Sequence, residues 1–467
     1  MDFWIIVRDW IYSYLGINII MDAVAENRPI PIQGYIQTIF SSLTLILGLL
    51  VCYRVLYFAL GMFGSSRKYP VTEKKNRYAF IIPAWNEEEV IGNLIDSIRA
   101  LDYPQDLIEI FVNCDNCTDK TGAIAEEKGA HVYYHDNPNE RTKGYGLKFL
   151  FAEMAKTYDI ANDFYAYTVF DADNVPAPDF LAKINDCLVA SGADECIGYR
   201  NCKNVDENWV SAICAVQSYS RNVNSLRARS ILNTNQEIYG CSTTLRAHVL
   251  ANGWPWVTLT EDLEMMSDLT AQNYKTAFCE EAVFYEEQPT TLKLLWRQRL
   301  RWGKGGLIAF AKCHWALFAS FCKKPTWSKY DIYWHYFPFA FVAFWWTLLY
   351  QIISIVLFLI VGDAGYNWWS FASYLLTTFG GLYVSWFFMD LVVIIREWKH
   401  ILLPWQRLPI YIFLFPLYSL VDPIIAACSA FVPTKWGKID HHVVKEAKAL
   451  KEAEDLKSQA AAPKEKA

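Results

Sequence analysis

Short apolar runs alternate with amphipathic stretches between about residues 77 and 290. Four apolar runs have the length of buried strands: YAFIIPA (78–84), IEIFVNC (108–114), AHVYYH (130–135) and FYAYTVFDAD (164–173). Three intervening stretches are typical of helices: EEVIGNLIDSIRAL (88–101), KTGAIAEEKG (120–129) and KGYGLKFLFAEMA (143–155). This alternation predicts an α/β domain with a mostly parallel sheet.

Longer apolar runs on both sides of this region predict membrane-spanning helices. Residues 36–63 exceed the length of about 20 apolar residues that crosses a bilayer, and residues 334–361, 370–396 and 406–431 are three further candidates. The basic segment SSRKYPVTEKKNR after the first run places the polar domain in the cytoplasm. Residues 3–20 mix charged with aromatic side chains, which favours an interfacial amphipathic helix over another span.

The topology of the last apolar run stays open. Acidic DAGYN and basic REWKH place residues 362–369 outside and 396–405 inside. One span before the polar domain and three after it would leave the C-terminus outside, whereas the charged tail is typical of a cytoplasmic extension. Pro416 and Pro423 offer an alternative, because prolines can break the run into a re-entrant pair and return the tail to the cytoplasm.

Composition supports a membrane protein and argues against a nucleic-acid-binding one. The chain of 467 residues is 53% hydrophobic and 16% aromatic, and its formal charge is −6 with basic residues scattered among acids. Its twelve cysteines stand mostly in apolar contexts, which is typical of buried reduced thiols. Cys114 and Cys117 form a CxxC, but no second ligand pair with zinc-like spacing follows.

Paired carboxylates follow one predicted strand. Asp171 and Asp173 end the run FDADN, and ligands of open α/β sheets bind at the carboxyl ends of strands. One or two carboxylates together with substrate phosphates are what Mg²⁺ or Mn²⁺ prefers. An Asx-rich turn before Pro176 is the alternative interpretation. The position after a strand favours a functional site.

A second acidic pair, Glu261 and Asp262 in TLTEDLEM, begins a predicted helix. Thr260 is expected to cap this helix, and the acids complement its dipole. One of the two carboxylates is also a candidate general base, since such a base must be ionised and within hydrogen-bond reach of the hydroxyl that it activates.

Four cations and two tryptophans crowd the stretch LLWRQRLRWGKGG, residues 294–306. A membrane-surface anchor, a solvated helix face and a cradle for a polyanion all fit this pattern. For Trp296, Arg297 and Arg299 we favour the membrane anchor. For Arg301 we favour a phosphate contact, and for Trp302 a flat face on which a sugar stacks.

In this order, PAWNEE, DNCTDKT, DAD, TED and QRLRW, followed by membrane spans, resemble the membrane-embedded processive β-glycosyltransferases of family 2. That group contains the cellulose, hyaluronan, chitin and poly-N-acetylglucosamine synthases. The resemblance covers roughly residues 36–435. It implies a GT-A domain inserted between transmembrane helices, a Mg²⁺ or Mn²⁺ cofactor, a UDP-sugar donor, inversion at the anomeric carbon and a growing polysaccharide as acceptor.

The resemblance also assigns roles to individual residues. It implies a donor-binding set, an acceptor-binding set, a metal ligand and a catalytic pair: Glu87, Glu88, Asp115, Lys143, Asp171, Gln298 and Arg301 for the donor, Trp302, Gly240, Cys241 and Ser242 for the acceptor, Asp173 for the metal, and Asp262 with Glu261 for catalysis. The gating-loop motif of bacterial cellulose synthases and a clear counterpart of the hyaluronan synthases' priming loop are not recognised, which leaves the product unidentified.

The expected organisation has six parts: an interfacial segment (1–35), a transmembrane helix (36–63), a cytoplasmic GT-A domain (64–290), interfacial helices with QxxRW (291–330), channel-forming helices (331–435) and a charged tail (436–467). The expected function is polymerisation of a β-linked polysaccharide from a UDP-sugar at the plasma membrane, with transfer of the polymer across the bilayer. Three rivals are a transferase that adds one sugar to a lipid, a nucleotide-sensing transporter, and a hydrolase with paired carboxylates.

Overall fold

The computed structural model describes residues 9, 12, 13, 15, 17–26, 32–361, 368–433 and 441–461. Most of the expected interfacial helix at 3–20 and of the expected loop at 362–369 falls outside these residues, as do 434–440 and 462–467 of the expected tail. The chain divides into two compact units: Met1–Leu56 with Phe339–Ser385, and Tyr57–Pro338 with Trp386–Ala467.

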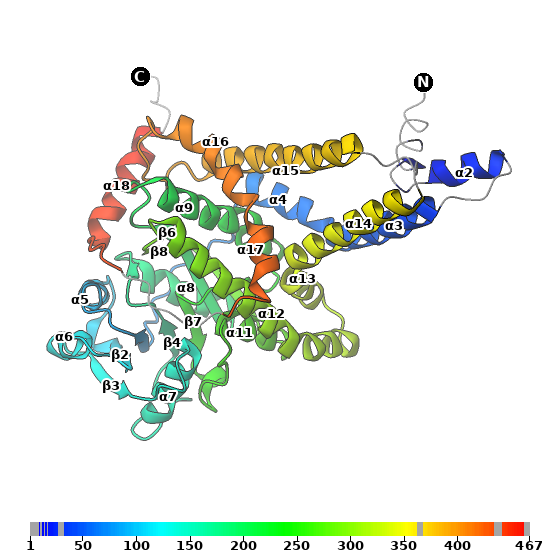
Figure 1. Cartoon of the computed structure of the whole chain (residues 1–467). Helices are drawn as coiled ribbons and strands as arrows, with labels where there is room; N and C mark the ends of the chain where they lie inside the picture. The colour runs from blue at the N-terminus through cyan, green and yellow to red at the C-terminus, as the bar shows by residue number, and fades with distance from the viewer. Residues whose placement is uncertain are drawn as a thin grey trace. The chain divides into compact units, whose positions relative to one another are not determined.

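The second unit contains an eight-stranded sheet of order β3-β2-β1-β4-β7-β6-β8-β5 (Figure 1). Its strands are β1 (Tyr78–Ala84), β2 (Ile108–Asp115), β3 (His131–His135), β4 (Ala166–Val169), β5 (Val175–Pro176), β6 (Glu195–Cys202), β7 (Thr243–Arg246) and β8 (Thr276–Glu286). Strands β3, β2, β1 and β4 are parallel, β7 is antiparallel to both β4 and β6, and β6 is parallel to β8. The predicted mostly parallel sheet is confirmed.

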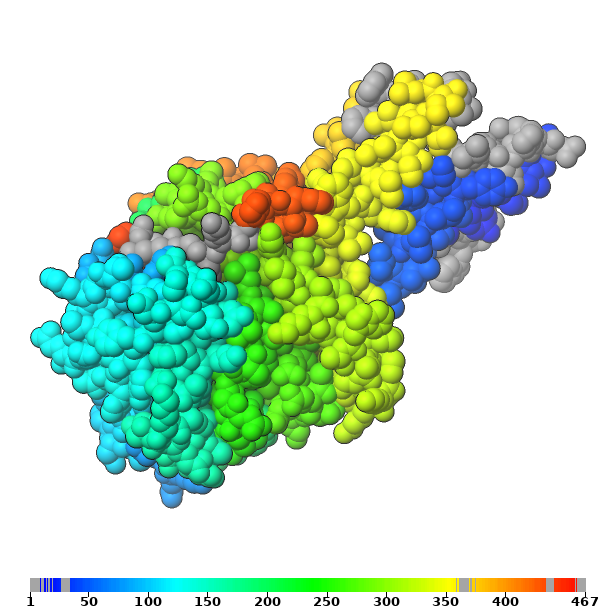
Figure 2. All heavy atoms as spheres, turned by 60° about the horizontal axis from the view of Figure 1, so that its bottom comes forward, coloured from blue at the N-terminus to red at the C-terminus, as the bar shows by residue number. Residues whose placement is uncertain are grey.

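Alternating side chains of β1 explain how helices cover both faces of the sheet. Phe80 and Ile82 join a core that includes α5 and α8, whereas Ala79 and Ile81 join a core that includes α7, α11 and α12. The helices of this unit are α5 (Ile91–Arg99), α6 (Thr121–Glu127), α7 (Lys143–Met154), α8 (Phe180–Ser191), α9 (Trp209–Arg221), α10 (Ala228–Leu232), α11 (Glu261–Ala271), α12 (Leu292–Lys323) and α13 (Trp327–Tyr336). Short η1 (Gln105–Leu107), η2 (Asn222–Arg227) and η3 (Ala247–Leu250) connect them. Figure 2 shows the cyan-to-lime spheres of this region packed into one continuous body.

The remaining helices are α2 (Ile17–Ala25), α3 (Ile32–Val51), α4 (Tyr53–Phe63), α14 (Phe339–Val361), α15 (Trp368–Arg396), α16 (Leu408–Ser419), α17 (Asp422–Ser429) and α18 (Ala447–Ala461). Among the described residues, five helical stretches are long and apolar enough to cross a membrane: Gly34–Phe63, Leu292–Lys323, Phe339–Leu357, Leu375–Arg396 and Leu408–Ser429. In the first unit, α3 and α14 pack together through the rings of Phe40 and Trp346, whose centroids are 4.2 Å apart.

Contacts along α12 hold it on the α/β domain, although its length and composition would suit a span. Lys312 forms an ion pair with Glu264 of α11. Farther along, the Ser320 hydroxyl donates a 2.6 Å hydrogen bond to the Ala271 carbonyl, at the end of α11. A helix that shares its polar contacts with a polar domain is not surrounded by lipid.

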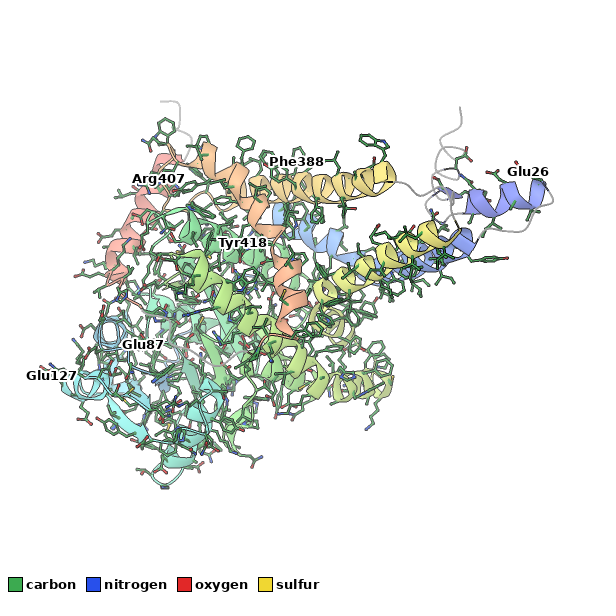
Figure 3. The ribbon with its side chains drawn as sticks, in the orientation of Figure 1. Glu26, Glu87, Glu127, Phe388, Arg407 and Tyr418 are labelled. Atoms are coloured by element: carbon green, nitrogen blue, oxygen red, sulfur yellow. The ribbon has the colours of Figure 1, made fainter. Side chains whose placement is uncertain are left out.

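The chain enters and leaves the α16–α17 segment on the surface of the same domain. Before α16, Arg407 (labelled in Figure 3) donates to the Asp206 carbonyl. After α17, the backbone NH groups of His442 and Val443 donate to the Glu287 carboxylate at 3.1 and 2.9 Å. Both ends therefore lie on the same side of the membrane.

Length alone does not decide this topology. Helix α16 has 12 residues and α17 has 8, and Pro423 stands at the start of α17. Together, however, Leu408–Ser429 is 22 residues long, about 33 Å, which is enough for a hydrocarbon core of about 30 Å. Only the contacts at both ends of the segment favour the re-entrant alternative.

Two buried arginines of neighbouring elements join the membrane-proximal helices to the sheet. Arg227 of η2 donates to the Gly61 carbonyl of α4 at 3.1 Å and to Glu397 after α15 at 2.7 Å, and it also pairs with Glu280 of β8. Arg229 of α10 donates to both oxygens of Asp331 on α13, at 2.7 and 3.1 Å. Since breaking a buried ion pair typically costs about 3–5 kcal/mol, these contacts fix where the ends of α4, α13 and α15 meet the domain.

Candidate active site

A cavity of about 270 Å³ opens at the carboxyl ends of β1, β2 and β4, where it is closed by α11 and α12. Twelve residues expected in the site line it: Glu87, Asp115, Lys143, Asp171, Asp173, Gly240, Cys241, Glu261, Asp262, Gln298, Arg301 and Trp302. We call it the catalytic cavity. Glu87, labelled in Figure 3, comes from the loop after β1.

Two expected residues, Glu88 and Ser242, do not line the catalytic cavity. The Glu88 carboxylate turns toward the start of α6, where it accepts a 3.0 Å hydrogen bond from the Lys120 NH. Ser242 is fully buried with φ of 58°, and its hydroxyl accepts a 3.0 Å bond from the Gly198 NH. Positive φ is unusual for a non-glycine residue, so Ser242 shapes the loop whose neighbours Gly240 and Cys241 reach the cavity.

The DxD segment forms a tight turn, as the Asx-turn interpretation predicted. Asn174 closes the turn by donating from its NH to the Asp171 carbonyl at 3.0 Å and accepting from the Asp171 NH at 3.1 Å. Asp173 is nearly buried, and its Oδ2 accepts a 2.9 Å bond from the Glu287 NH. The turn presents both carboxylates to the catalytic cavity.

Lys143 lies at the centre of the motifs. Thr142 caps α7, and the first residue of that helix, Lys143, donates to Asp171 and to the Gly240 carbonyl, with Glu261 3.8 Å away. Burial alone would lower the pKa of Lys143, but Asp171 and Glu261 outweigh it and raise the pKa above its ordinary value. The ammonium therefore links the DxD turn, the Gly240 loop and the acidic pair of α11, rather than lying open for a phosphate alone.

The acidic pair begins α11, inside the cavity. Burial raises the pKa of both carboxyls, and that of Glu261 reaches about 7 despite Lys143. The Asp262 Oδ1 accepts a 2.9 Å bond from the Leu263 NH. A group with a pKa near neutrality suits a general base. The expected Thr260 cap is wrong: the Thr260 hydroxyl is buried and makes no capping hydrogen bond.

One face of α12 carries Gln298, Arg301 and Trp302 into the catalytic cavity, because positions i, i+3 and i+4 of a helix share a face. Burial lowers the pKa of Arg301, which remains a cation. Within the part of the chain that the structure describes, no hydrogen bond or ion pair of its guanidinium is recorded. This charge is available to a bound anion.

The membrane-anchor interpretation fits Trp296 and Arg297, which are exposed. It is wrong for Arg299. The Arg299 guanidinium lies 4.6 Å from the Trp302 ring centroid and donates to Gln217 of α9. Arg299 is on the side of α12 that faces α9, so it supports the Trp302 ring instead of reaching lipid.

Sequence reasoning missed several lining or supporting residues. His135, at the end of β3, contacts Asp115 through its Nδ1 at 2.9 Å, and Arg200 of β6 pairs with Glu286 of β8 at 3.2 Å. The rule that ligands bind at strand ends already points to His135, which ends the recognised run 130–135, and it would have pointed to Arg200 and Glu286 had β6 and β8 been recognised. His441, whose Nδ1 is 3.1 Å from Glu87, comes from beyond the last apolar run and carries no local signal.

Charge in the catalytic cavity suits a metal-bound diphosphate. Nine carboxylates line it: Glu87, Asp115, Asp171, Asp173, Glu237, Glu261, Asp262, Glu286 and Glu287. The lining cations are Lys143, Arg200, Arg221 and Arg301, with His441 beside Glu87. These carboxylates would repel a bound anion, so a diphosphate would bind more favourably together with a divalent cation. Among the described residues, no group of three or more His, Cys, Asp or Glu side chains is arranged to hold a metal ion.

Comparison with known proteins identifies related domains. Residues 76–305 match the family described as "Glycosyltransferase like family 2". The chain is 26% identical over 316 residues to "Probable glycosyltransferase YdaM" of Bacillus subtilis, covering 62% of this chain and 72% of that protein. It is 29% identical over 240 residues to "Beta-monoglucosyldiacylglycerol synthase" of Synechocystis, covering 48% and 47%. It is 25% identical over 248 residues to "Poly-beta-1,6-N-acetyl-D-glucosamine synthase" of Staphylococcus epidermidis, covering 51% and 56%.

The matches to the latter two relatives span about half of their length. Among solved structures, the mannosyltransferase PcManGT from Pyrobaculum calidifontis, in complex with GDP-Man and Mn²⁺, has a TM-score of 0.50 at 17% identity, covering 78% of this chain and 99% of that one. The expected α/β glycosyltransferase fold is confirmed.

The buried acidic pair predicts a pH dependence of stability. The pKa of Glu261 is raised to about 7 from its ordinary value of 4.5, so the folded state holds a proton that the unfolded state loses, and stability falls as pH rises through this window. Glu261→Gln should melt close to wild type at pH 5. At pH 8 it should melt at a higher temperature than wild type, because its free energy of unfolding is larger by on the order of 3 kcal/mol.

Differential scanning calorimetry at both pH values measures this effect. Glu127→Gln, at the exposed end of α6, is the matched control and should follow wild type. Equal melting of Glu261→Gln and wild type at pH 8 would show that Glu261 is ionised without cost in the folded protein.

Proposed function

The chain carries a family 2 glycosyltransferase domain at residues 76–305, and from this premise we propose that it polymerises a β-linked polysaccharide from a UDP-sugar in a metal-dependent, inverting reaction. The observation that carries the proposal is the meeting of the DxD turn, the acidic pair of α11 and the QxxRW face of α12 in one cavity. Each motif has a separate task in glycosyl transfer, and they are far apart in sequence.

We assign the nucleoside end of the donor to Asp115 and Glu87. Asp115 is held by His135 and by Asn116, whose amide donates a 2.7 Å hydrogen bond to it, so its carboxylate is oriented before a ligand arrives. A uracil or ribose offers NH or OH donors that such an acceptor binds. Glu87 is oriented in the same way by His441.

We assign the diphosphate to Asp171, Asp173 and Arg301. Asp173, with Asp171 beside it, would hold a Mg²⁺ or Mn²⁺ ion, which when bound neutralises charge on the diphosphate. Arg301 has a guanidinium with no recorded partner among the described residues, and fixed cations of this kind stabilise the charge that grows on a leaving diphosphate. Lys143 fixes the DxD turn against Gly240 and Glu261.

We assign the general base to Asp262, with Glu261 tuning its proton affinity. The base takes the proton from the acceptor hydroxyl, whose oxygen then attacks the anomeric carbon opposite the leaving diphosphate. An attack from the opposite face inverts the anomeric configuration, so an α-linked donor gives a β-linked product. A Cβ at Gly240 would lie 3.8 Å from Asp262 Oδ2 and 3.4 Å from Glu261 Oε1, so Gly240 borders both carboxylates.

We assign the terminal sugar of the acceptor to the Trp302 ring. Arg299 and Arg221 lie over this ring, with guanidinium carbons 4.6 and 5.9 Å from its centroid, which fixes its orientation. A polar domain in the cytoplasm would receive UDP-sugar from the nucleotide pool and feed the product into the membrane helices. The basic segment after α4 supports this orientation.

A lipid acceptor is the second candidate. The likeness to a β-monoglucosyldiacylglycerol synthase, at 29% identity, favours it, whereas the likeness to a poly-β-1,6-N-acetylglucosamine synthase favours a polymer. Both products need the same donor chemistry, and they differ in the acceptor, a lipid or a growing sugar chain, and in the number of sugars added.

Substitutions on α12 separate the proposed catalytic face from the exposed one. Arg301→Ala should weaken UDP binding by about tenfold or more, because a charge-assisted contact is lost. Trp302→Ala should bind UDP normally and fail to elongate, because the stacking surface for the acceptor is removed. Isothermal titration with UDP, alongside product sizing, measures both effects.

Trp296→Ala is the matched control, since Trp296 lies on the same helix and is 39% exposed. It should keep both UDP affinity and product length near wild type. Similar behaviour of the two tryptophan variants, together with unchanged UDP affinity in Arg301→Ala, would make this helix a membrane anchor only.

The function itself is tested with a panel of UDP-sugars. Purified full-length protein should release UDP from one or a few of them, only with Mg²⁺ or Mn²⁺, and the product should be a long β-linked chain by gel sizing and linkage-specific glycosidase digestion. A single sugar on a lipid would favour the second candidate. No UDP release from any donor would refute both.

A further inference from the structure

A second cavity of about 270 Å³ lies in the same unit as the sheet and shares no lining residue with the catalytic cavity. It is bounded by the segment after α4, by residues 233–236, by the start of β8 and by the α12–α13 junction. Four cations line it: Arg67, Lys275, Lys324 and Lys329. None of its described lining residues is Asp or Glu. We call it the basic cavity.

The cations of the basic cavity lack acidic partners within the described part of the chain. No ion pair of their four side chains is recorded there. Asp194 accepts a 2.8 Å bond from the backbone NH of Lys275, but its carboxylate pairs with His248 at 3.0 Å and does not line the cavity. Several like charges around one hollow repel each other unless an anion enters.

The cavity has a buried cation at its base and exposed cations at its mouth. Lys329 is 2% exposed, and its ammonium donates to the Ser320 and Lys324 carbonyls at 3.1 Å, which caps the end of α12. Arg67 and Lys324 are exposed. The Arg67 guanidinium donates a 2.9 Å hydrogen bond to the side-chain amide oxygen of Asn233, which orients it. An anion at the mouth would therefore meet an oriented guanidinium.

The floor of the cavity offers polar groups for the rest of a ligand. Gln236 is 1% exposed, its amide nitrogen donates to the Thr234 carbonyl at 3.2 Å, and its Oε1 accepts no hydrogen bond from the described residues. Since an acceptor buried without a donor costs about 1–3 kcal/mol, this oxygen points to a ligand that carries a hydroxyl. A phosphate group would bind to the cations, and a hydroxyl group would donate to Gln236. A phosphate ester that carries a hydroxyl has both groups.

We propose that the basic cavity binds the phosphate group of a hydroxylated phosphate ester. The ester has two possible sources. Arg67 follows the end of α4 at Phe63 by four residues, so the headgroup of an acidic glycerolipid lies within reach if α4 ends at the membrane surface. A soluble glycerol or sugar phosphate presents the same groups.

Paired substitutions test the site without touching the catalytic cavity. In Arg67→Gln/Lys324→Gln, two exposed cations of the mouth are removed. The matched control is Lys68→Gln/Lys323→Gln, which removes two exposed cations one position away that do not line the cavity. The two variants have the same net charge, and melting of each without ligand checks that the fold is kept.

Two probes distinguish the sources. Native mass spectrometry of full-length protein in a nonionic detergent counts bound phosphatidylglycerol, with phosphatidylcholine as the lipid that lacks free hydroxyls. Calorimetry with sn-glycerol 1-phosphate measures the soluble ligand. We expect wild type and the control to bind at least one probe, and Arg67→Gln/Lys324→Gln to bind it about tenfold more weakly or worse, because charge-assisted contacts are lost.

Each outcome decides the proposal. Binding of sn-glycerol 1-phosphate supports a soluble source, and binding of phosphatidylglycerol alone supports the membrane lipid. Failure of wild type to bind either probe, or equal weakening in the two double variants, would overturn it, since the second result would reflect net charge and not the cavity.

Discussion

Charge confinement in the catalytic cavity is the constraint on which the site depends. Nine carboxylates face one hollow, and Lys143 balances two of them while it joins three motifs. Burial raises the pKa of Glu261 and Asp262, so these carboxylates bind a proton more strongly, as a general base requires. Arg301 is left without a recorded partner among the described residues. These carboxylates and the Arg301 guanidinium are the charges that the proposed nucleotide-sugar and its divalent cation would meet in this cavity.

The position of this cavity follows from how the domain holds its membrane-proximal helices. Arg227 and Arg229 sit on consecutive elements and reach α4, α13 and the residues after α15 through buried ion pairs. Such pairs are weak evidence for extra stability, because desolvation offsets their attraction, but breaking one is costly. They therefore fix the positions of the membrane-proximal helix ends. These ends are held against the same domain that carries the DxD turn and Trp302.

Features that depend on the spacing of residues near one another in the sequence could be predicted. The strand at 78–84 follows from periodicity alone. The family resemblance singled out Gln298, Arg301 and Trp302, and their helical spacing explains why they share one face of α12. Contacts between distant segments left no such signal. His441 reaches Glu87 from beyond the last apolar run, and Arg299 turns toward α9 because of how α12 is packed, although its neighbours in sequence suggested lipid. The hydropathy of 408–429 does not distinguish a span from a re-entrant pair. The contacts at both ends of this segment favour the re-entrant pair.

The central claim is that Asp173 joins a divalent cation to the donor diphosphate, and the most direct measurement is calorimetric UDP affinity with and without Mn²⁺ in wild type and Asp173→Asn. Asp173 is nearly buried and bonded to the Glu287 backbone, so an isosteric amide keeps its shape. The account predicts that Mn²⁺ strengthens UDP binding by about tenfold or more in wild type and has little effect in Asp173→Asn. Equal strengthening in both proteins, or none in wild type, would contradict it.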